Sequence, residues 1–209
     1  MVRKWIAYII GLTLLGIGIA LIIEADVGLG AWDIYFVNLV EASKSNFTIV
    51  QSINSLLLVV VSYIIRKKLP NISVLLIILN AAYIGFVIDI TRNLLISPSH
   101  IILGFIQLVF AVAVVAIGVN ISRVTKIILP ALDFFNESIQ LRTGISFGRV
   151  KQIVEFVVML IGLAIGYIYD LPLRLGLGTI FILISGGLFV NFLYEPIKNI
   201  LSKFGINPE

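Results

Sequence analysis

Apolar residues fill six long stretches of the chain, and shorter polar or glycine-containing segments separate them. A run of about 17 to 25 mainly apolar residues can cross a bilayer as an α-helix, because the hydrocarbon core is about 30 Å thick and a helix rises about 1.5 Å per residue. The pattern therefore predicts an all-α membrane protein with about six transmembrane helices. The predicted spans are Trp5–Ile23, Thr48–Ile65, Val74–Leu95, His100–Asn120, Phe147–Tyr169 and Gly176–Tyr194.

The second half of the chain resembles the first half when the sequence is shifted by 100 residues. Two such halves with three spans each must enter the membrane in opposite directions, as do the inverted repeats of many secondary transporters. We therefore predict a first repeat over residues 1–96, an inverted second repeat over 97–196 and a tail over 197–209. Residues that recur 100 positions later include Ile17, Gly18, Leu29, Ala31, Asp33, Phe47, Val50 and Ile53.

A segment that is too short to cross the membrane follows the first span of each repeat. In the first repeat it contains Gly28 and Gly30, then Asp33 and the mainly apolar residues 34–42. Glycine suits a sharp reversal of the chain, and aspartate suits the N-cap of a helix. We therefore predict a re-entrant or interfacial half-helix here and another at the matching residues 130–141.

The N-termini of these half-helices are candidate binding places for a solute. Irregular backbone at membrane depth needs protein or water to satisfy it, and a helix N-terminus favours anionic groups. Asp33 and its counterpart Asp133 are therefore candidate substrate-binding residues. The alternative is that both carboxylates only cap their helices at the membrane interface.

Small and polar residues form a stripe on the span that follows each half-helix. Lipid contact favours large apolar side chains, so the stripe is predicted to face the interior of the helix bundle. Ser52, Ser55 and Gln152 are its candidate substrate-binding residues. The stripe comprises Thr48, Gln51, Ser52, Ser55 and Ser62 in the first repeat, and Gly148, Lys151, Gln152, Glu155 and Gly162 in the second.

Glu155 is the candidate coupling residue for proton or ion movement. It is predicted to lie about two turns inside a span, which makes it the best candidate in the chain for a protonatable coupling group. Lys151, one turn earlier, is the candidate partner. The alternative is an ion pair near the cytoplasmic end of the span that extends towards water.

The distribution of basic residues predicts the orientation in the membrane. Short cytoplasmic loops collect lysine and arginine. A cytoplasmic N-terminus leaves only Lys44, Arg92 and Arg174 of the 15 basic residues outside. We therefore predict that both termini are cytoplasmic. This topology explains the net charge of +4, so we expect no nucleic-acid partner.

The chemistry of the sequence argues against an enzyme and against a bound cofactor. There is no cysteine and one histidine, His100, which excludes thiolate and multi-histidine metal sites. No glycine-rich loop ends in Lys-Ser or Lys-Thr, and no serine lies in a nucleophile elbow. We therefore predict no metal, no cofactor and no enzymatic activity, with energy supplied by a gradient or a partner.

The tail has the pattern of a basic amphipathic helix. Glu195-Pro196 is predicted to end the last span, after which apolar residues recur on one face and Lys198 and Lys203 lie elsewhere. Such a helix is expected to rest on the cytoplasmic leaflet. Its apolar residues are Ile197, Ile200, Leu201 and Phe204.

One motif of the first repeat resembles a known family. The run Ala25-Asp26-Val27-Gly28, followed after three residues by Trp32-Asp33, is similar to the YczE/YitT-type family of bacterial integral membrane proteins. In that family a proline usually precedes the Trp-Asp pair, where this chain has Ala31. A Thr-Gly-x-Ser-x-Gly segment also follows the half-helix in the family, and here it occurs clearly in the second repeat, as Thr143–Gly148. The resemblance implies a permease-like protein of the bacterial cytoplasmic membrane.

Together these features predict a secondary transporter or facilitator for a small solute, with an anion favoured by the half-helix N-termini. A chain this short has little room for both a gate and a scaffold, so we expect a homodimer in the lipid bilayer. Two alternatives remain open. One is a non-transporting, solute-binding or assembly subunit of a larger complex with a partner ATPase, and the other is a lipid flippase or scramblase.

Overall fold

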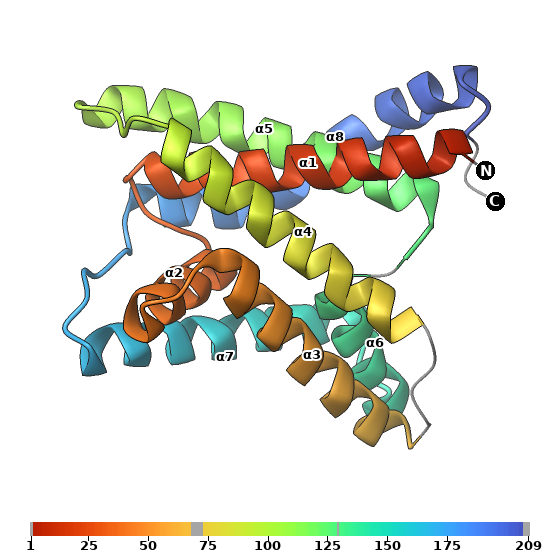
Figure 1. The fold of residues 1–209 in the computed structure, drawn as a ribbon, viewed down its shortest axis with the longest axis horizontal. Coiled ribbons are helices and arrows are strands. Elements are labelled where there is room, and N and C mark those ends of the chain that lie inside the picture. Colours follow the sequence, from red (N-terminus) through yellow and green to blue (C-terminus); the bar gives the residue numbers. More distant parts are fainter. Residues whose placement is uncertain (1, 68–72, 129, 207–209) are drawn as a thin grey trace. The chain divides into compact units, whose positions relative to one another are not determined.

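The computed structural model describes residues 2–67, 73–128 and 130–206 of the 209-residue chain. These residues form eight helices and the loops between them (Figure 1). The end of the predicted tail, 207–209, lies outside the described residues. In chain order the helices are α1 (Val2–Glu24), α2 (Ala31–Ser43), α3 (Phe47–Arg66), α4 (Ser73–Leu94), α5 (Ile101–Thr125), α6 (Ala131–Thr143), α7 (Phe147–Ile168) and α8 (Leu177–Lys203).

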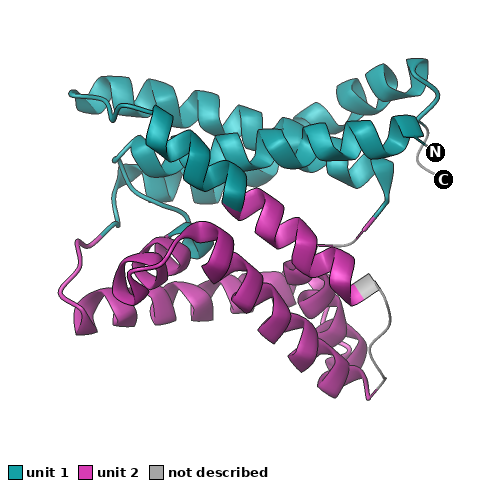
Figure 2. Ribbon diagram, in the orientation of Figure 1, with its two compact units in different colours: residues 1–33, 86–127, 174–209 teal, residues 34–85, 128–173 magenta. Residues whose placement is uncertain are grey.

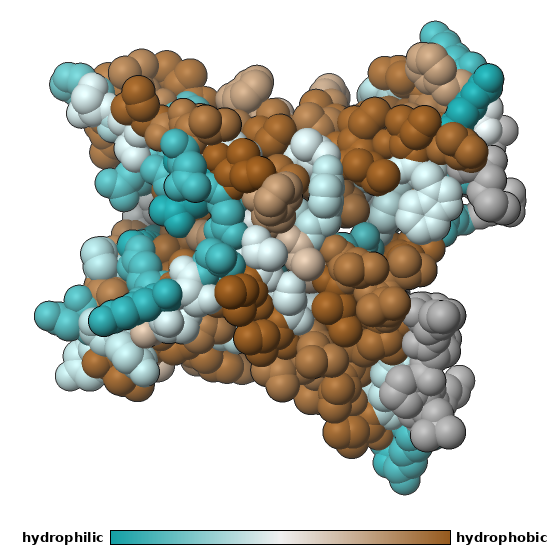
Figure 3. All heavy atoms as spheres, in the orientation of Figure 1, coloured by the Kyte–Doolittle hydropathy of each residue, from teal (hydrophilic) through white to brown (hydrophobic). Residues whose placement is uncertain are grey.

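Six of these helices, α1, α3, α4, α5, α7 and α8, are long and apolar enough to cross a membrane. Each overlaps one of the six predicted spans, which confirms that prediction. Their outer faces carry large apolar side chains, such as Leu183 at 79% exposure and Phe192 at 78%. Figure 3 shows such side chains over much of α1 and α3. Because water would not tolerate so much exposed apolar surface, the chain is a multi-pass membrane protein.

The order of long and short helices is repeated along the chain. The short helices α2 and α6 both have 13 residues and begin 100 residues apart, and α3 and α7 also begin 100 residues apart. A short helix is therefore present in each half where the sequence predicts one. The prediction that Asp33 is the N-cap is wrong, because α2 begins at Ala31 and Asp33 lies in its first turn.

The chain divides into two compact units, which Figure 2 shows in different colours. Unit 1 comprises residues 1–33, 86–127 and 174–209, and unit 2 comprises residues 34–85 and 128–173. Helices α1, α5 and α8 lie in unit 1, while α3, α6, α7 and most of α2 lie in unit 2. Each unit therefore contains helices from both sequence repeats.

In unit 1, glycines bring α1 and α5 into close contact. A Cβ atom added to Gly18 would lie 2.6 Å from Val115 Cγ2, and one added to Gly118 would lie 2.7 Å from the Leu15 backbone nitrogen. A shift of 100 residues converts the first pair into the second. Small residues thus let the two backbones approach. The contact of the α1 glycine with α5 has a counterpart in the contact of the α5 glycine with α1.

The helices α1 and α5 run antiparallel. In the first half of α1, Gly11 lies against Gly118 in the later part of α5. Near the end of α1, the Leu21 carbonyl accepts a hydrogen bond of 2.9 Å from Gln107 Nε2 in the early part of α5. The first helices of the two predicted repeats therefore run in opposite directions within unit 1.

The last helix continues past the proline at which the sequence predicts its end. Helix α8 runs through Pro196, and Figure 1 shows its dark blue final turns at an angle to the earlier part. Proline removes one backbone donor and bends a helix, and the helix can resume beyond it. Ile197 and Leu201 then pack in a buried cluster with Ala7 of α1. Part of the tail's apolar face is therefore covered by protein, whereas Phe204 is exposed.

In unit 2, α6 packs against α3. Val59 of α3 and Ala131 of α6 belong to one buried apolar cluster, and the rings of Tyr63 and Phe134 lie 5.5 Å apart. The short helix of the second repeat is thus held by a long helix of the first repeat.

Candidate functional site

The short helix α2 lies close to α7 within unit 2, because two glycines of α7 leave room for it. A Cβ atom added to Gly162 would lie 2.8 Å from Tyr35 Cα, and one added to Gly166 would lie 2.8 Å from Asn38 Nδ2. The Asn38 amide nitrogen donates a hydrogen bond of 2.8 Å to the Gly162 carbonyl. The short helix of the first repeat is therefore held by a long helix of the second, as α6 is held by α3.

Polar side chains of α3 are enclosed in unit 2. The Tyr35 hydroxyl donates a hydrogen bond of 3.1 Å to Asn54 Oδ1. Ser55 is buried, and its hydroxyl lies 3.5 Å from the Ile77 carbonyl. Ser52 is half-buried and bonds the Thr48 carbonyl of its own helix. The buried polar residues of α3 are Gln51, Asn54, Ser55 and Ser62, so the first repeat's stripe faces inward as predicted.

The corresponding residues of α7 lie in a different environment. Lys151 and Gln152 are exposed, and Glu155 is half-buried. Lys151 Nζ lies 3.9 Å from Glu155 Oε1, so these residues form the ion pair that the sequence predicts. The prediction of an interior stripe therefore holds for α3 and is wrong for the first turns of α7, where Gly148, Lys151 and Gln152 are exposed. A partly exposed pair of this kind contributes about 0–1 kcal/mol.

Each short helix buries one asparagine that the sequence analysis missed. Asn38 of α2 is 1% exposed and Asn136 of α6 is 3% exposed. In the described residues neither amide oxygen accepts a hydrogen bond. Most buried polar atoms are paired, so two unpaired oxygens on two repeat-related helices need an explanation. The two positions do not match under the 100-residue shift, which is why the repeat did not reveal them.

Asp33 closes the first turn of α2 by bonding back to the loop before it. Its carboxylate accepts a hydrogen bond from the Gly30 backbone, and Ile182 of α8 lies beside the same glycine. Burial raises the pKa of Asp33 from 3.8 to about 7, and the Gly30 hydrogen bond opposes this rise. Asp133 occupies the matching position of α6. Its N-cap is Pro130, which has no N–H, whereas Gly30 at the matching position donates to Asp33.

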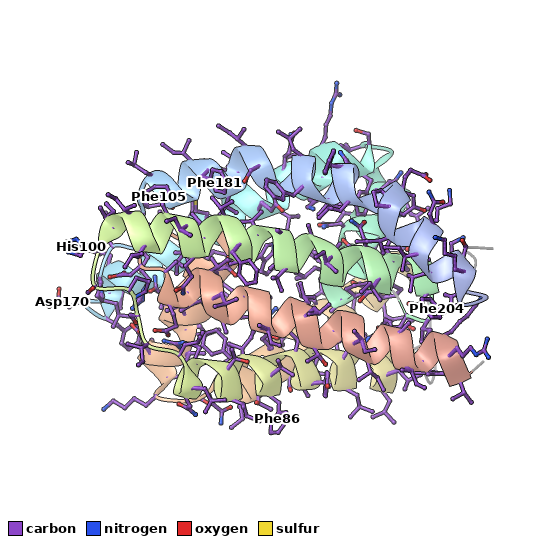
Figure 4. The ribbon with its side chains drawn as sticks, turned by 90° about the horizontal axis from the view of Figure 1, so that it is seen from above. Phe86, His100, Phe105, Asp170, Phe181 and Phe204 are labelled. Atoms are coloured by element: carbon purple, nitrogen blue, oxygen red, sulfur yellow. The ribbon has the colours of Figure 1, made fainter. Side chains whose placement is uncertain are left out.

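His100 lies away from these groups in the chain and immediately precedes α5. Its side chain is exposed, and Figure 4 places it at the opposite end of unit 1 from Phe204.

Six membrane-crossing helices and two short helices, arranged on a repeated sequence, define a multi-pass helical membrane protein. The chain belongs to the family of unknown function DUF6198, which matches residues 2–195. The match spans both repeats and stops directly before Pro196. No curated protein and no solved structure matches the chain.

Replacing Asn136 with leucine is expected to raise the free energy of unfolding by about 1 kcal/mol. The substitution removes a buried oxygen that accepts no hydrogen bond, while leucine keeps a similar branched shape. The matched control is Asn54→Leu, which should lower stability because it leaves the Tyr35 hydroxyl without its acceptor. Thermal unfolding of the purified proteins in one detergent would measure both. An equal decrease in the stability of both variants would contradict the expectation.

Proposed function

We propose that this protein is a secondary transporter or facilitator that moves a small polar solute across the bacterial cytoplasmic membrane. The proposal rests on one observation, the pair of buried and unpaired amide oxygens on the two short helices. Such atoms lower stability unless a ligand donates to them, and binding sites are where proteins keep groups of this kind. We infer a homodimer with both termini cytoplasmic, related to the YczE/YitT-type permease-like proteins.

The contacts of unit 1 support an inverted repeat. A two-fold axis makes contacts reciprocal, so that residue i of one copy meets residue j of the other and the reverse. The pairs Gly18–Val115 and Gly118–Leu15 have this property under a 100-residue shift, and their helices run antiparallel. We therefore infer a two-fold axis in the membrane plane that relates the repeats. Inverted repeats of this kind allow alternating access to a site near the bilayer midplane.

The proposed solute contacts lie in unit 2. Asn38 and Asn136 supply acceptors, and Ser55 supplies a hydroxyl that its long contact to Ile77 leaves free to turn. Asp133, Ser52 and Gln152 keep the binding roles proposed from the sequence. The half-helix N-termini favour an anionic solute that also carries hydrogen-bond donors for the two amide oxygens.

Energy coupling is proposed for Glu155, with Lys151 as its partner in the unloaded state. The distance of 3.9 Å and the partial exposure of both side chains describe a weak pair. A weak pair can open at little cost when a proton or a substrate competes for the carboxylate. Asp33 is a separate candidate for proton binding at the start of α2.

The test is ligand-induced thermal stabilisation of the purified full-length protein, followed by flux into proteoliposomes. A panel of small anions, amino acids and vitamins at two pH values should contain compounds that raise the melting temperature, because binding to the native state stabilises it. Asn136→Leu should abolish the shift while Asn199→Ala, on the exposed part of α8, keeps it. The proposal would be overturned by compounds that raise the melting temperature of both variants equally. It would also be overturned if no bound compound is transported into proteoliposomes.

A further inference from the structure

A small basic pocket opens in unit 2 where α3 and α6 end. It has a volume of about 240 Å³ and is lined by Ile65, Arg66, Lys67, Ser138, Leu141 and Arg142. Pockets for drug-sized ligands usually measure about 300–1,000 Å³, so this one suits a compact group. We propose that it binds a phosphate group carried by an anionic ligand. The site is independent of the proposed transport function.

Arg66 forms the fixed wall of the pocket. Its Nε donates to Ser138 Oγ at 2.7 Å, and its Nη2 donates to Glu137 Oε2 at 2.8 Å and to the Phe134 carbonyl at 3.3 Å. The guanidinium also stacks on the Phe134 ring at 4.1 Å from its centre. These contacts hold the guanidinium in one orientation, so little entropy is lost when a ligand binds to it.

The remaining donor group of Arg66 is available to a ligand. In the described part of the chain Nη1 has no hydrogen-bond partner, and the side chain is 17% exposed. Nη1 carries two N–H groups that can donate to phosphate oxygens. The Ser138 hydroxyl already donates to the Phe134 carbonyl at 2.6 Å, so it positions Arg66 and does not itself contact the ligand.

Lys67 and Arg142 complete the pocket as exposed cations. Both side chains are exposed, and neither forms an ion pair with the described residues. Lys67 follows α3 in the left-handed conformation at φ 51°, and Arg142 lies in the last turn of α6. The pocket therefore combines the three positive charges of Arg66, Lys67 and Arg142 with the one negative charge of Glu137, which leaves a local charge of +2.

The location favours a phosphate over other anions. The sequence places these basic residues on the cytoplasmic side, where the leaflet carries anionic lipids. Basic pockets between membrane helices on that side bind phosphate-bearing headgroups. Single cations at helix C-termini are also explained by the helix dipole. That explanation does not account for the oriented Arg66 or for the convergence of three cations on one pocket.

The experiment compares two sources of the same phosphate chemistry in the full-length protein at fixed ionic strength. One arm adds phosphatidylglycerol to a phosphatidylcholine–detergent micelle, and the other adds inorganic phosphate. The melting temperature reports binding. We expect a saturable rise in at least one arm. The double variant Lys67→Gln/Arg142→Gln should require at least tenfold more ligand for the same rise. Both side chains are exposed and form no ion pair with the described residues, and the substitutions keep the backbone bonds, so the variant should fold.

The control is Arg149→Gln/Lys203→Gln, which removes the same charge from two other exposed positions predicted to be cytoplasmic. It should bind as the wild type does. A response to phosphatidylglycerol alone identifies a lipid headgroup, and a response to inorganic phosphate identifies a soluble phosphate compound. No response in either arm would overturn the proposal. An equal loss of affinity in the two double variants would also overturn it, because it would show unspecific attraction by the total charge.

Discussion

Replacing Gly18 or Gly118 with leucine is expected to lower the free energy of unfolding by about 3 kcal/mol or more, the largest effect we predict for a single substitution. A Cβ atom at either position would lie within 3 Å of atoms in the facing helix, including backbone atoms that cannot turn aside. The side chain would therefore push α1 and α5 apart and expose the contacts that join them. Thermal unfolding and the yield of monodisperse protein in detergent would measure the loss.

Gly187→Leu is the matched control for this prediction. Gly187 also lies inside a membrane-crossing helix, α8, but a Cβ atom there would meet no heavy atom within 4 Å. Leucine is also the better helix former, so this variant should be as stable as the wild type. Unchanged stability of Gly18→Leu and Gly118→Leu would refute the close packing of α1 on α5.

The second large effect is expected from pH. The raised pKa of Asp33 means that the folded protein holds a proton that the unfolded chain has already released. Stability from this proton is present below about pH 4 and is lost as the pH rises to about 7. We expect a loss on the order of 1–3 kcal/mol across this range. Asp33→Asn, which cannot ionise, should remove most of this dependence from the melting temperature.

Asp26→Asn is the control for the pH series. Asp26 lies seven residues before Asp33 on the adjoining loop, and its side chain is exposed. Its φ of 49° is in the left-handed region, which asparagine adopts as readily as aspartate. The variant should therefore fold and should keep the pH dependence of the wild type. If Asp33→Asn retains that dependence, the buried proton belongs to another group.

Much of the fold follows from the order of residues along the chain. Hydropathy alone predicts the six long helices, because a lipid environment leaves few alternatives for an apolar stretch of this length. The short helices follow from the repeat, since Asp33 and Asp133 stand at the same place in each half. The continuation of α8 through Pro196 could not be predicted, because it depends on packing of Ile197 and Leu201 against other helices.

The candidate sites were harder to predict, because they depend on which helices meet. Asn136 is notable only after burial leaves its amide oxygen unpaired, and no local pattern reports that. Arg66 resembles an ordinary basic residue after a membrane span until Glu137 and Ser138, about 70 positions later, surround it. The polar stripes of α3 and α7 look alike in sequence, yet α3 is more enclosed by its neighbours.

The division of the chain into units that each combine both repeats bears on how the protein is made. Helix α1 packs against α5, whose first residue follows the last residue of α1 by 77 positions. During synthesis the glycine face of α1 therefore has no partner helix until α5, which begins at Ile101, has been inserted into the membrane. Contacts so distant along the chain close slowly. We therefore expect the unassembled first half to depend on lipid, or on an insertion factor, to shield that face until α5 arrives.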